Sequence, residues 1–389
     1  MIDPRIKEWA TARQGEYIDA VNQYGSIRKA AKILKVDHST VGKSVRAAGR
    51  RAALAGYSPE HDMTKTVPDG FGVKGVSTLY GDDGQVKVQW VKSQRNEQDL
   101  YEAMKEAIAS LVEDVHGQAK PIKAPKRTTD QAMTLYPMGD PHIGMYAWSE
   151  ECGEDFDCDI ARANLSGAMA RLVGCAPNTD IGTIINVGDF FHADNLNNST
   201  MRSGNPLDVD TRWPRVLELG VLAMRDCIDM ALRKHKEVKV INAIGNHDDH
   251  SSVMLSMCLS AFYHNEPRVT IEKTISKFHY VEFHKNLLGV THGDTVKMQD
   301  LAGLMSVDKP EAWGRTQHRY WLTGHIHHRQ LWEQPGCLVE SFRTLAGKDS
   351  YHSAHGYRAG RDMVCIVIDK DHGEVERHRV DISMLNSDD

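Results

Sequence analysis

The 389-residue sequence lacks the features of membrane proteins and of disulfide-stabilised proteins. No segment approaches the roughly 18 consecutive apolar residues that a membrane-spanning helix needs. The first residues, MIDPRIKEW, contain acids and a proline and have no apolar core, unlike a secretory signal. The seven cysteines are odd in number and include no Cys-x-x-Cys pair, which disfavours a disulfide framework or a zinc ribbon. We therefore expect a cytoplasmic protein with free thiols and no membrane partner.

The composition excludes a largely disordered chain and divides it into two parts. Hydrophobic residues make up 41% and charged residues 26%, which is ordinary for a globular protein. Residues 1–130 carry 21 Lys and Arg against 17 Asp and Glu, whereas the remainder carries 26 against 36. The net charges are therefore +4 and −10, and 17 of the 20 histidines lie in the acidic part. We expect the two parts to have separate functions.

The first 60 residues have the pattern of three short helices. Apolar residues recur with helical spacing over 8–24, 27–34 and 38–51, and Ser26 and Asp37 are suited to cap the last two helices. The segment GSIRKAAKILKVDHSTVGKSVRAAGRR resembles helix-turn-helix DNA-binding domains. This resemblance implies a recognition helix whose DNA contacts are His38, Ser39, Thr40, Lys43, Arg46, Arg50 and Arg51. The alternative is a three-helix module that binds protein.

The next segment predicts an extension and a linker. Residues 76–79 and 86–90 alternate like paired strands, and residues 97–115 have helical spacing, so 61–116 is expected to form a β-hairpin plus helix. Residues 117–131 are polar and contain two prolines, which predicts a linker. The expected order is a helix-turn-helix domain over 1–60, the extension, the linker, and a body over 132–389.

In the body, five apolar runs each end in residues that bind metals. The endings are Gly-Asp-Pro-His at 139–142, Gly-Asp-Phe-Phe-His at 188–192, Gly-Asn-His-Asp at 245–248, His-Gly-Asp at 292–294 and Gly-His-Ile-His at 324–327. Glycine permits tight turns and close backbone approach at such positions. Divalent cations favour this mixture of carboxylate, amide oxygen and imidazole. The pattern predicts a metal site assembled at one edge of a sheet.

In order and spacing, these blocks resemble the calcineurin-like metallophosphoesterase superfamily over residues 134–345. The resemblance implies an α/β (α+β) fold, a four-layer β-sandwich flanked by helices. It also implies two divalent metal ions, with Mn²⁺ favoured over Fe, Zn or Mg. The first ion would be held by Asp140, His142, Asp189 and His327. The second would share Asp189 and add Asn246, His292 and His325.

The resemblance also assigns catalytic roles. His247 would assist the leaving group, with Asp248 hydrogen-bonded behind it. The 188–192 block is similar to that of the double-strand-break repair nucleases, which makes His192 a second active-site histidine. The alternative is that His192 only orients Asp189. Arg202 and Arg212, in a polar stretch after this block, are either phosphate contacts or ordinary surface arginines.

These features predict a dinuclear-metal phosphodiesterase, a DNA nuclease delivered to DNA by its helix-turn-helix. Overall the chain looks like enzymes that tailed bacteriophages encode, which would place it in the bacterial host cytoplasm. No GxxxxGK[ST] motif occurs, so an ATPase would have to be a separate protein partner. The alternatives are a phosphomonoesterase or protein phosphatase with a protein-interaction front domain, and an inactive metal-binding regulator. A homodimer is left open.

Overall fold

The computed structural model describes residues 2–66, 71–81, 83, 86–95, 116–195, 198–200 and 204–385. The chain divides into two compact units, Met1–Ala107 and Ile108–Asp389. The helix predicted over 97–115 lies outside the described residues, as does Arg202.

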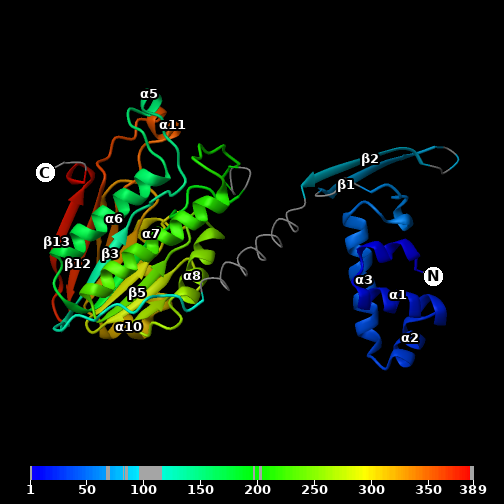
Figure 1. Ribbon diagram of the computed structural model, residues 1–389, viewed down its shortest axis with the longest axis horizontal. Coiled ribbons are helices and arrows are strands. Elements are labelled where there is room, and N and C mark those ends of the chain that lie inside the picture. Colours follow the sequence, from blue (N-terminus) through cyan, green and yellow to red (C-terminus); the bar gives the residue numbers. More distant parts are fainter. Residues whose placement is uncertain are drawn as a thin grey trace. The chain divides into compact units, whose positions relative to one another are not determined.

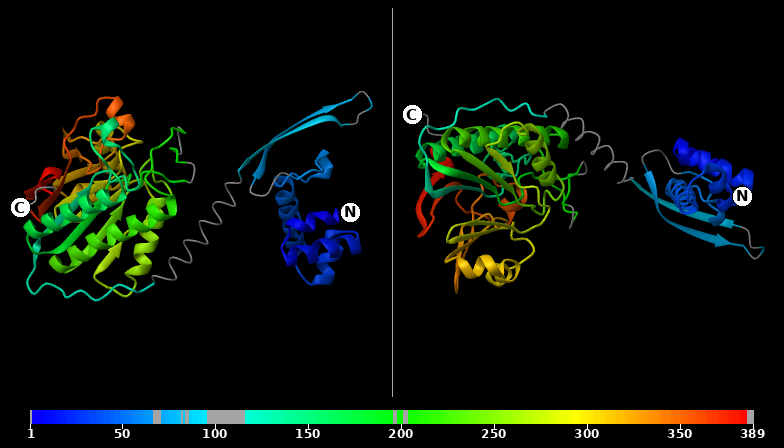
Figure 2. Two further views of the ribbon diagram at one scale, coloured as in Figure 1. Left: turned by 45° about the horizontal axis from the view of Figure 1, so that its top comes forward. Right: turned by 90° about the horizontal axis from the view of Figure 1, so that it is seen from below.

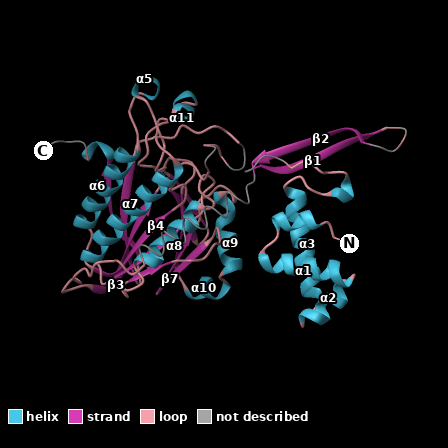
Figure 3. Cartoon of the chain, turned by 45° about the vertical axis from the view of Figure 1, so that its right-hand side comes forward, coloured by secondary structure: helices cyan, strands magenta, loops and turns pink. Residues whose placement is uncertain are grey.

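The described residues of the first unit form three α-helices and a β-hairpin (Figure 3). Two N-caps follow the prediction: the Ser26 hydroxyl accepts a hydrogen bond from the Lys29 amide, and the Asp37 carboxylate accepts one from the Ser39 amide. Ala30 and Ala31 are buried in the core between the helices, where their small side chains permit close packing. The elements are η1 (Pro4–Trp9), α1 (Ala12–Tyr24), α2 (Ile27–Leu34), α3 (His38–Leu54), η2 (Pro59–His61), β1 (Phe71–Tyr80) and β2 (Val86–Arg95).

The second unit contains two β-sheets and the helices that cover them (Figure 1). Its strands are β3 (Thr129–Met138), β4 (Thr179–Asn186), β5 (Glu237–Asn242), β6 (Val269–Ile271), β7 (His279–Phe283), β8 (Asn286–Val290), β9 (His318–Thr323), β10 (Gln330–Gln334), β11 (Cys337–Ser341), β12 (Asp362–Asp369) and β13 (Gly373–Asp381). Its helices are α5 (Ser149–Cys152), α6 (Cys158–Cys175), α7 (Trp213–Lys234), α8 (Ser251–Phe262), η3 (Met298–Asp300), α9 (Leu301–Asp308), α10 (Pro310–Arg315), α11 (Ser350–Ala354) and η4 (Ile382–Met384). None of the helices in the described parts of the chain combines the length and the hydropathy needed to cross a membrane.

The strands form one six-stranded and one five-stranded sheet. The first has the order β13-β12-β3-β4-β5-β6, in which β3 to β6 are parallel. The second has the order β10-β11-β9-β8-β7, with β11, β9 and β8 parallel. Parallel strands buried on both faces consist of nearly continuous apolar runs, which is why the runs were visible in the sequence.

The two sheets pack face to face between helices, so the predicted four-layer sandwich is confirmed. Leu135, Ile185 and Leu288 belong to the core between the sheets. On the outer face of the six-stranded sheet lie α6, α7 and α8, whose buried residues share a core with β3, β4 and β5. The other sheet is covered by α9 and α10, which pack around Trp321. Figure 2 shows the green helices and the yellow helices on opposite sides of the body.

Residues 117–122 of the predicted linker over 117–131 are attached to the body. The Gly117 amide donates to the Ala261 carbonyl at 2.8 Å, and the guanidinium of Arg268 donates to the Ile122 carbonyl at 2.7 Å. Ile122 also packs against the core beneath the helices. The polar composition concealed these contacts because they use backbone groups. The division between the two units lies earlier, after Ala107.

Candidate metal centre

The predicted ligands all follow the carboxyl ends of parallel strands. Asp140 and His142 come after β3, Asp189 after β4 and Asn246 after β5 in the six-stranded sheet. His292 follows β8, and His325 and His327 follow β9 in the other sheet. Because the strand ends meet at the same edge of the sandwich, residues more than 180 positions apart come together, as in the contact between the His325 amide and the Asp140 carboxylate.

Five of the seven predicted ligands have a left-handed backbone conformation. The φ angles are 40° at Asp140, 46° at His142, 48° at Asp189, 71° at His325 and 55° at His327. Residues other than glycine rarely adopt such angles, and strained residues cluster at functional sites. Only four other non-glycine residues in the described parts of the chain share this conformation. The fold therefore holds these side chains in orientations that ordinary turns would not give.

Glycines make room for this arrangement. At Gly188, where φ is +106°, a Cβ atom would lie 2.5 Å from Nδ1 of His292. At Gly245, a Cβ atom would lie 2.0 Å from Oδ1 of Asp189. Side chains at either position would displace a predicted ligand, so both glycines are required by close approach.

The ligands predicted for the second ion are gathered in one group. Nε2 of His292 lies 3.1 Å from Oδ2 of Asp189 and 3.1 Å from Oδ1 of Asn246. His325 offers a ligand atom within 4.8 Å of those of Asp189 and His292. Nδ1 of His292 donates to the Val187 carbonyl at 3.0 Å, which leaves Nε2 to face the two oxygens. A cation between these atoms would take the place of the proton on Nε2 and be bound by one imidazole nitrogen and two oxygens.

The ligands predicted for the first ion converge in the same way. Nε2 of His142 and Nε2 of His327 are 3.1 Å apart, and Oδ2 of Asp140 is 3.5 Å from the latter nitrogen. Oδ1 of Asp140 is buried without a hydrogen-bond partner. Asp189, the predicted bridge, is joined to this group through its carbonyl, which accepts from the His142 amide at 3.0 Å. The donor set fits a borderline divalent cation, because imidazole nitrogens and carboxylate oxygens converge in a buried place.

The electrostatics of the site keep most of its imidazoles neutral. Burial lowers the pKa of His327 to about 3, and burial together with repulsion by His247 lowers the pKa of His192 to about 3. At His292 burial opposes protonation, but the carboxylates of Asp189 and Asp140 outweigh it and raise its pKa to about 10. Neutral imidazole is the metal-binding form, and a cation beside Asp189 would replace the proton that this carboxylate favours on His292.

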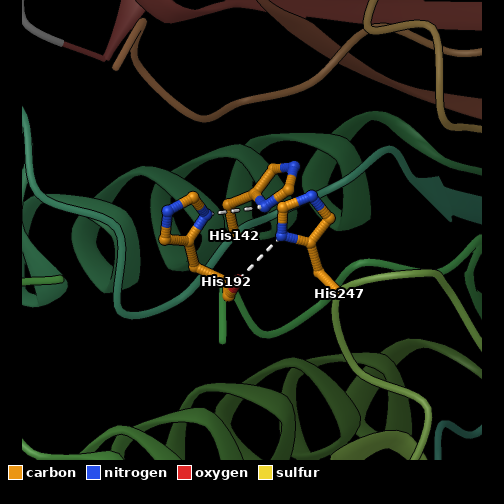
Figure 4. A group of neighbouring side chains, drawn as sticks. All are labelled: His142, His192 and His247. Carbon is orange, nitrogen blue, oxygen red and sulfur yellow. Dashed lines mark hydrogen bonds between the residues drawn. The ribbon is translucent and has the colours of Figure 1, made fainter. Parts of the chain in front are cut away.

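Three histidines, His142, His192 and His247, meet beside the predicted ligands (Figure 4). Nδ1 of His192 lies 3.2 Å from Nδ1 of His142, and the rings of His192 and His247 are stacked with centroids 5.4 Å apart. Nδ1 of His247 donates to the His192 carbonyl at 2.8 Å, so its Nε2 is not needed for that bond. Nε2 of His192 is buried without a hydrogen-bond partner. This group was not visible as one unit in the sequence, where its members belong to three blocks.

The role predicted for Asp248 requires a correction. The ring of His247 is oriented by the His192 carbonyl rather than by the Asp248 carboxylate. Asp248 instead accepts hydrogen bonds from the backbone amides of Phe190 and Gly245, at 2.8 and 3.0 Å. The carboxylate therefore ties the loop after β4 to the loop after β5. Adjacent side chains in a tight turn point in different directions, so sequence adjacency did not imply contact.

The described residues that were predicted to contact DNA or phosphate lie on α3 and just before α7. His38, Ser39, Thr40, Lys43, Arg46, Arg50 and Arg51 are all exposed on α3. However, the guanidinium of Arg51 donates to the Trp9 carbonyl at 2.7 Å and to the Gln14 side chain, so it holds η1 and α1 against α3. Both acceptors are uncharged, so the phosphate contact predicted for Arg51 stays a prediction. Arg212 is exposed just before α7 and belongs to neither group of metal-ligand side chains, so its predicted phosphate contact stays a prediction.

Sequence reasoning missed two residues beside His327. The ring of His352 stacks on that of His327 with a centroid separation of 4.8 Å and an interplanar angle of 18°. Nδ1 of His352 donates to the Asp349 carboxylate at 2.5 Å. The only signal in the sequence was the Asp-x-x-His spacing, which suits one helical turn but is common.

No protein-family model matches the chain, and no curated protein matches it in sequence. Among solved structures it is similar to a predicted phosphoesterase from Streptococcus pneumoniae TIGR4, at 11% identity and a TM-score of 0.27, over 64% of this chain and 98% of that one. It is also similar to Vps29 complexed with Zn²⁺ from Entamoeba histolytica (12% identity, TM-score 0.26, 64% and 99%). Vacuolar Protein Sorting 29 from Cryptosporidium parvum is a third such structure (12%, 0.29, 64% and 98%). The activity proposed for this chain therefore rests on the residues of its site.

Proposed function

We propose that the body is a two-metal phosphodiesterase and that the whole chain is a DNA nuclease. The observation that carries the proposal is the convergence of seven ligand-type residues, five of them with left-handed backbone, next to His192 and His247. The five sequence blocks follow the order of the calcineurin-like metallophosphoesterase pattern, which supports the same chemistry.

The chain's own residues have distinct tasks in this proposal. Asp140, His142, Asp189 and His327 would hold one cation, and Asp189, Asn246, His292 and His325 the other. Two such ions activate water for attack and neutralise the charge that develops on the phosphoryl oxygens. The Val187 carbonyl fixes the tautomer of His292. Because Nδ1 of His247 donates to the His192 carbonyl, its Nε2 is left for the substrate. In the imidazolium form this Nε2 would donate its proton to the leaving oxygen, and the ring would become neutral.

A DNA substrate is favoured by the first unit. Lys43, Arg46 and Arg50 are exposed on α3, which follows a three-residue turn after α2. Exposed bases along a helix after such a turn suit contact with the phosphates of a duplex. The body has a net charge of −10 and attracts nucleic acid less than the positively charged first 130 residues do. Binding of DNA by the first unit would therefore bring the substrate to the body.

Two assays test the proposal. With Mn²⁺ present, the full chain should hydrolyse bis-p-nitrophenyl phosphate faster than p-nitrophenyl phosphate. A preference for the monoester would instead favour the phosphomonoesterase alternative. Linear and circular DNA, single- and double-stranded, should then be degraded by the wild type and not by Asp189→Asn. If the chromogenic diester is cleaved and no DNA is, the nuclease assignment is wrong and the phosphodiesterase assignment stands.

A further inference from the structure

A cavity of about 320 Å³ adjoins the first-ion group of ligands. His327 forms part of its wall, and most of the remaining wall comes from residues 344–361. This segment is fixed beside the site, because the Thr344 hydroxyl donates to the Asp140 carbonyl at 2.6 Å. A molecule that fills the cavity would therefore contact His327, a predicted metal ligand.

The charges that line the cavity favour an anion. Its two carboxylates are each paired with an arginine, Glu154 with Arg361 and Asp381 with Arg379. Lys348 and Arg358 also line the cavity, and within the described parts of the chain neither has an ion pair. The guanidinium of Arg358 donates only to backbone carbonyls, which leave its charge in place. In a body with a net charge of −10, this is a local positive surface.

The cavity also has aromatic walls. The ring of His352 stacks on that of His327 and lies edge to face with that of Tyr357, at a centroid distance of 5.0 Å. Tyr357 is 41% exposed and lines the cavity. Exposed aromatic faces beside cations are the features with which proteins hold single-stranded nucleotides, since each base can stack and each phosphate can pair.

We propose that this cavity binds the nucleotide next to the scissile phosphate, with its further phosphate on Lys348 and Arg358 and its base against His352 and Tyr357. The inference rests on the proposed function and narrows the substrate to an oligonucleotide. A bare diester or a monoester would leave the cavity empty. His352 and Tyr357 are then substrate-positioning residues.

A pair of nucleotide esters tests the inference on the full chain. The first is thymidine 5′-(p-nitrophenyl phosphate), and the second carries an additional 3′-phosphate. The measured quantity is the ratio of kcat/KM for the second ester to that for the first. The ratio should fall about ten-fold in the Lys348→Ala/Arg358→Ala variant, which removes two charge-assisted contacts, and about three-fold in Lys348→Ala alone. Arg171→Ala, which removes an exposed arginine from α6 outside the cavity, should leave the ratio unchanged.

Binding distinguishes this inference from the proposed function. Calorimetry with thymidine 3′,5′-bisphosphate should give about ten-fold weaker binding to the double variant than to the wild type. If the wild type hydrolyses neither ester but shows this difference, the proposed reaction is wrong and the cavity assignment stands. An unchanged ratio, or equal affinities for the bisphosphate, would overturn the assignment.

Discussion

Gly245→Ala should inactivate the metal centre without unfolding the body. The added Cβ would lie 2.0 Å from Oδ1 of Asp189 and 2.3 Å from its backbone nitrogen, whereas real Cβ atoms essentially never approach closer than 3.0 Å. The carboxylate must therefore move by about 1 Å, and a misplacement of that size in a catalytic arrangement costs about 10²-fold in rate. We expect turnover of bis-p-nitrophenyl phosphate to fall by about that factor.

The control is Gly174→Ala, in helix α6. A Cβ at Gly174 meets no atom within 4 Å, and alanine is favoured over glycine in a helix, so activity and stability should be retained. Bound metal is measured by mass spectrometry, and folding by circular dichroism. Loss of metal from the Gly245 variant, with a normal spectrum, is the expected result. If that variant binds two ions and turns over like the wild type, the close approach of Gly245 to Asp189 does not shape the site.

Three further outcomes are expected. The His247→Ala variant should keep its metals while its turnover falls roughly 10²–10⁴-fold, as expected for the loss of a general acid. Full activity of this variant on a diester with a poor leaving group would refute the role of His247 as the general acid. Replacing Lys43, Arg46 and Arg50 by Ala should reduce the slope of log affinity against log salt by about 0.9 per lost phosphate contact, as measured by fluorescence anisotropy with DNA. An unchanged slope would argue against DNA binding by α3. Arg51→Ala should mainly lower the Tm, because the partners of this side chain are Trp9 and Gln14. Burial lowers the pKa of His235 to about 4 in the folded chain, below its unfolded value near 6.5. The contribution of neutral His235 to the free energy of unfolding is therefore complete above pH 6.5 and is lost as the pH falls toward 4. Urea unfolding of the metal-free chain should show that the free energy of unfolding falls by about 3 kcal/mol over this pH range in the wild type and not in His235→Gln. Parallel pH profiles of the two proteins would contradict this expectation.

The sequence alone displayed the helices of the first unit, the buried strands that precede the site and the ligand-type residues that follow these strands. Buried parallel strands consist of uninterrupted apolar residues, and each run was followed within a few residues by glycine, aspartate, asparagine or histidine. Helix caps such as Ser26 and Asp37 act over two or three residues, so they too are local. These features depend on spacing along the chain, which a sequence displays directly.

Contacts between distant segments were decided only by the tertiary structure. The stacking of His352 on His327 depends on how the segment after β11 passes the edge of the sandwich, and no spacing encodes that path. The attachment of Ile122 by Arg268 uses a backbone carbonyl, which every residue possesses. Asp248 binds amides rather than His247 because the direction of a side chain in a turn follows the backbone angles. Local chemistry thus marked the candidate ligands, while packing determined which neighbours each of them has.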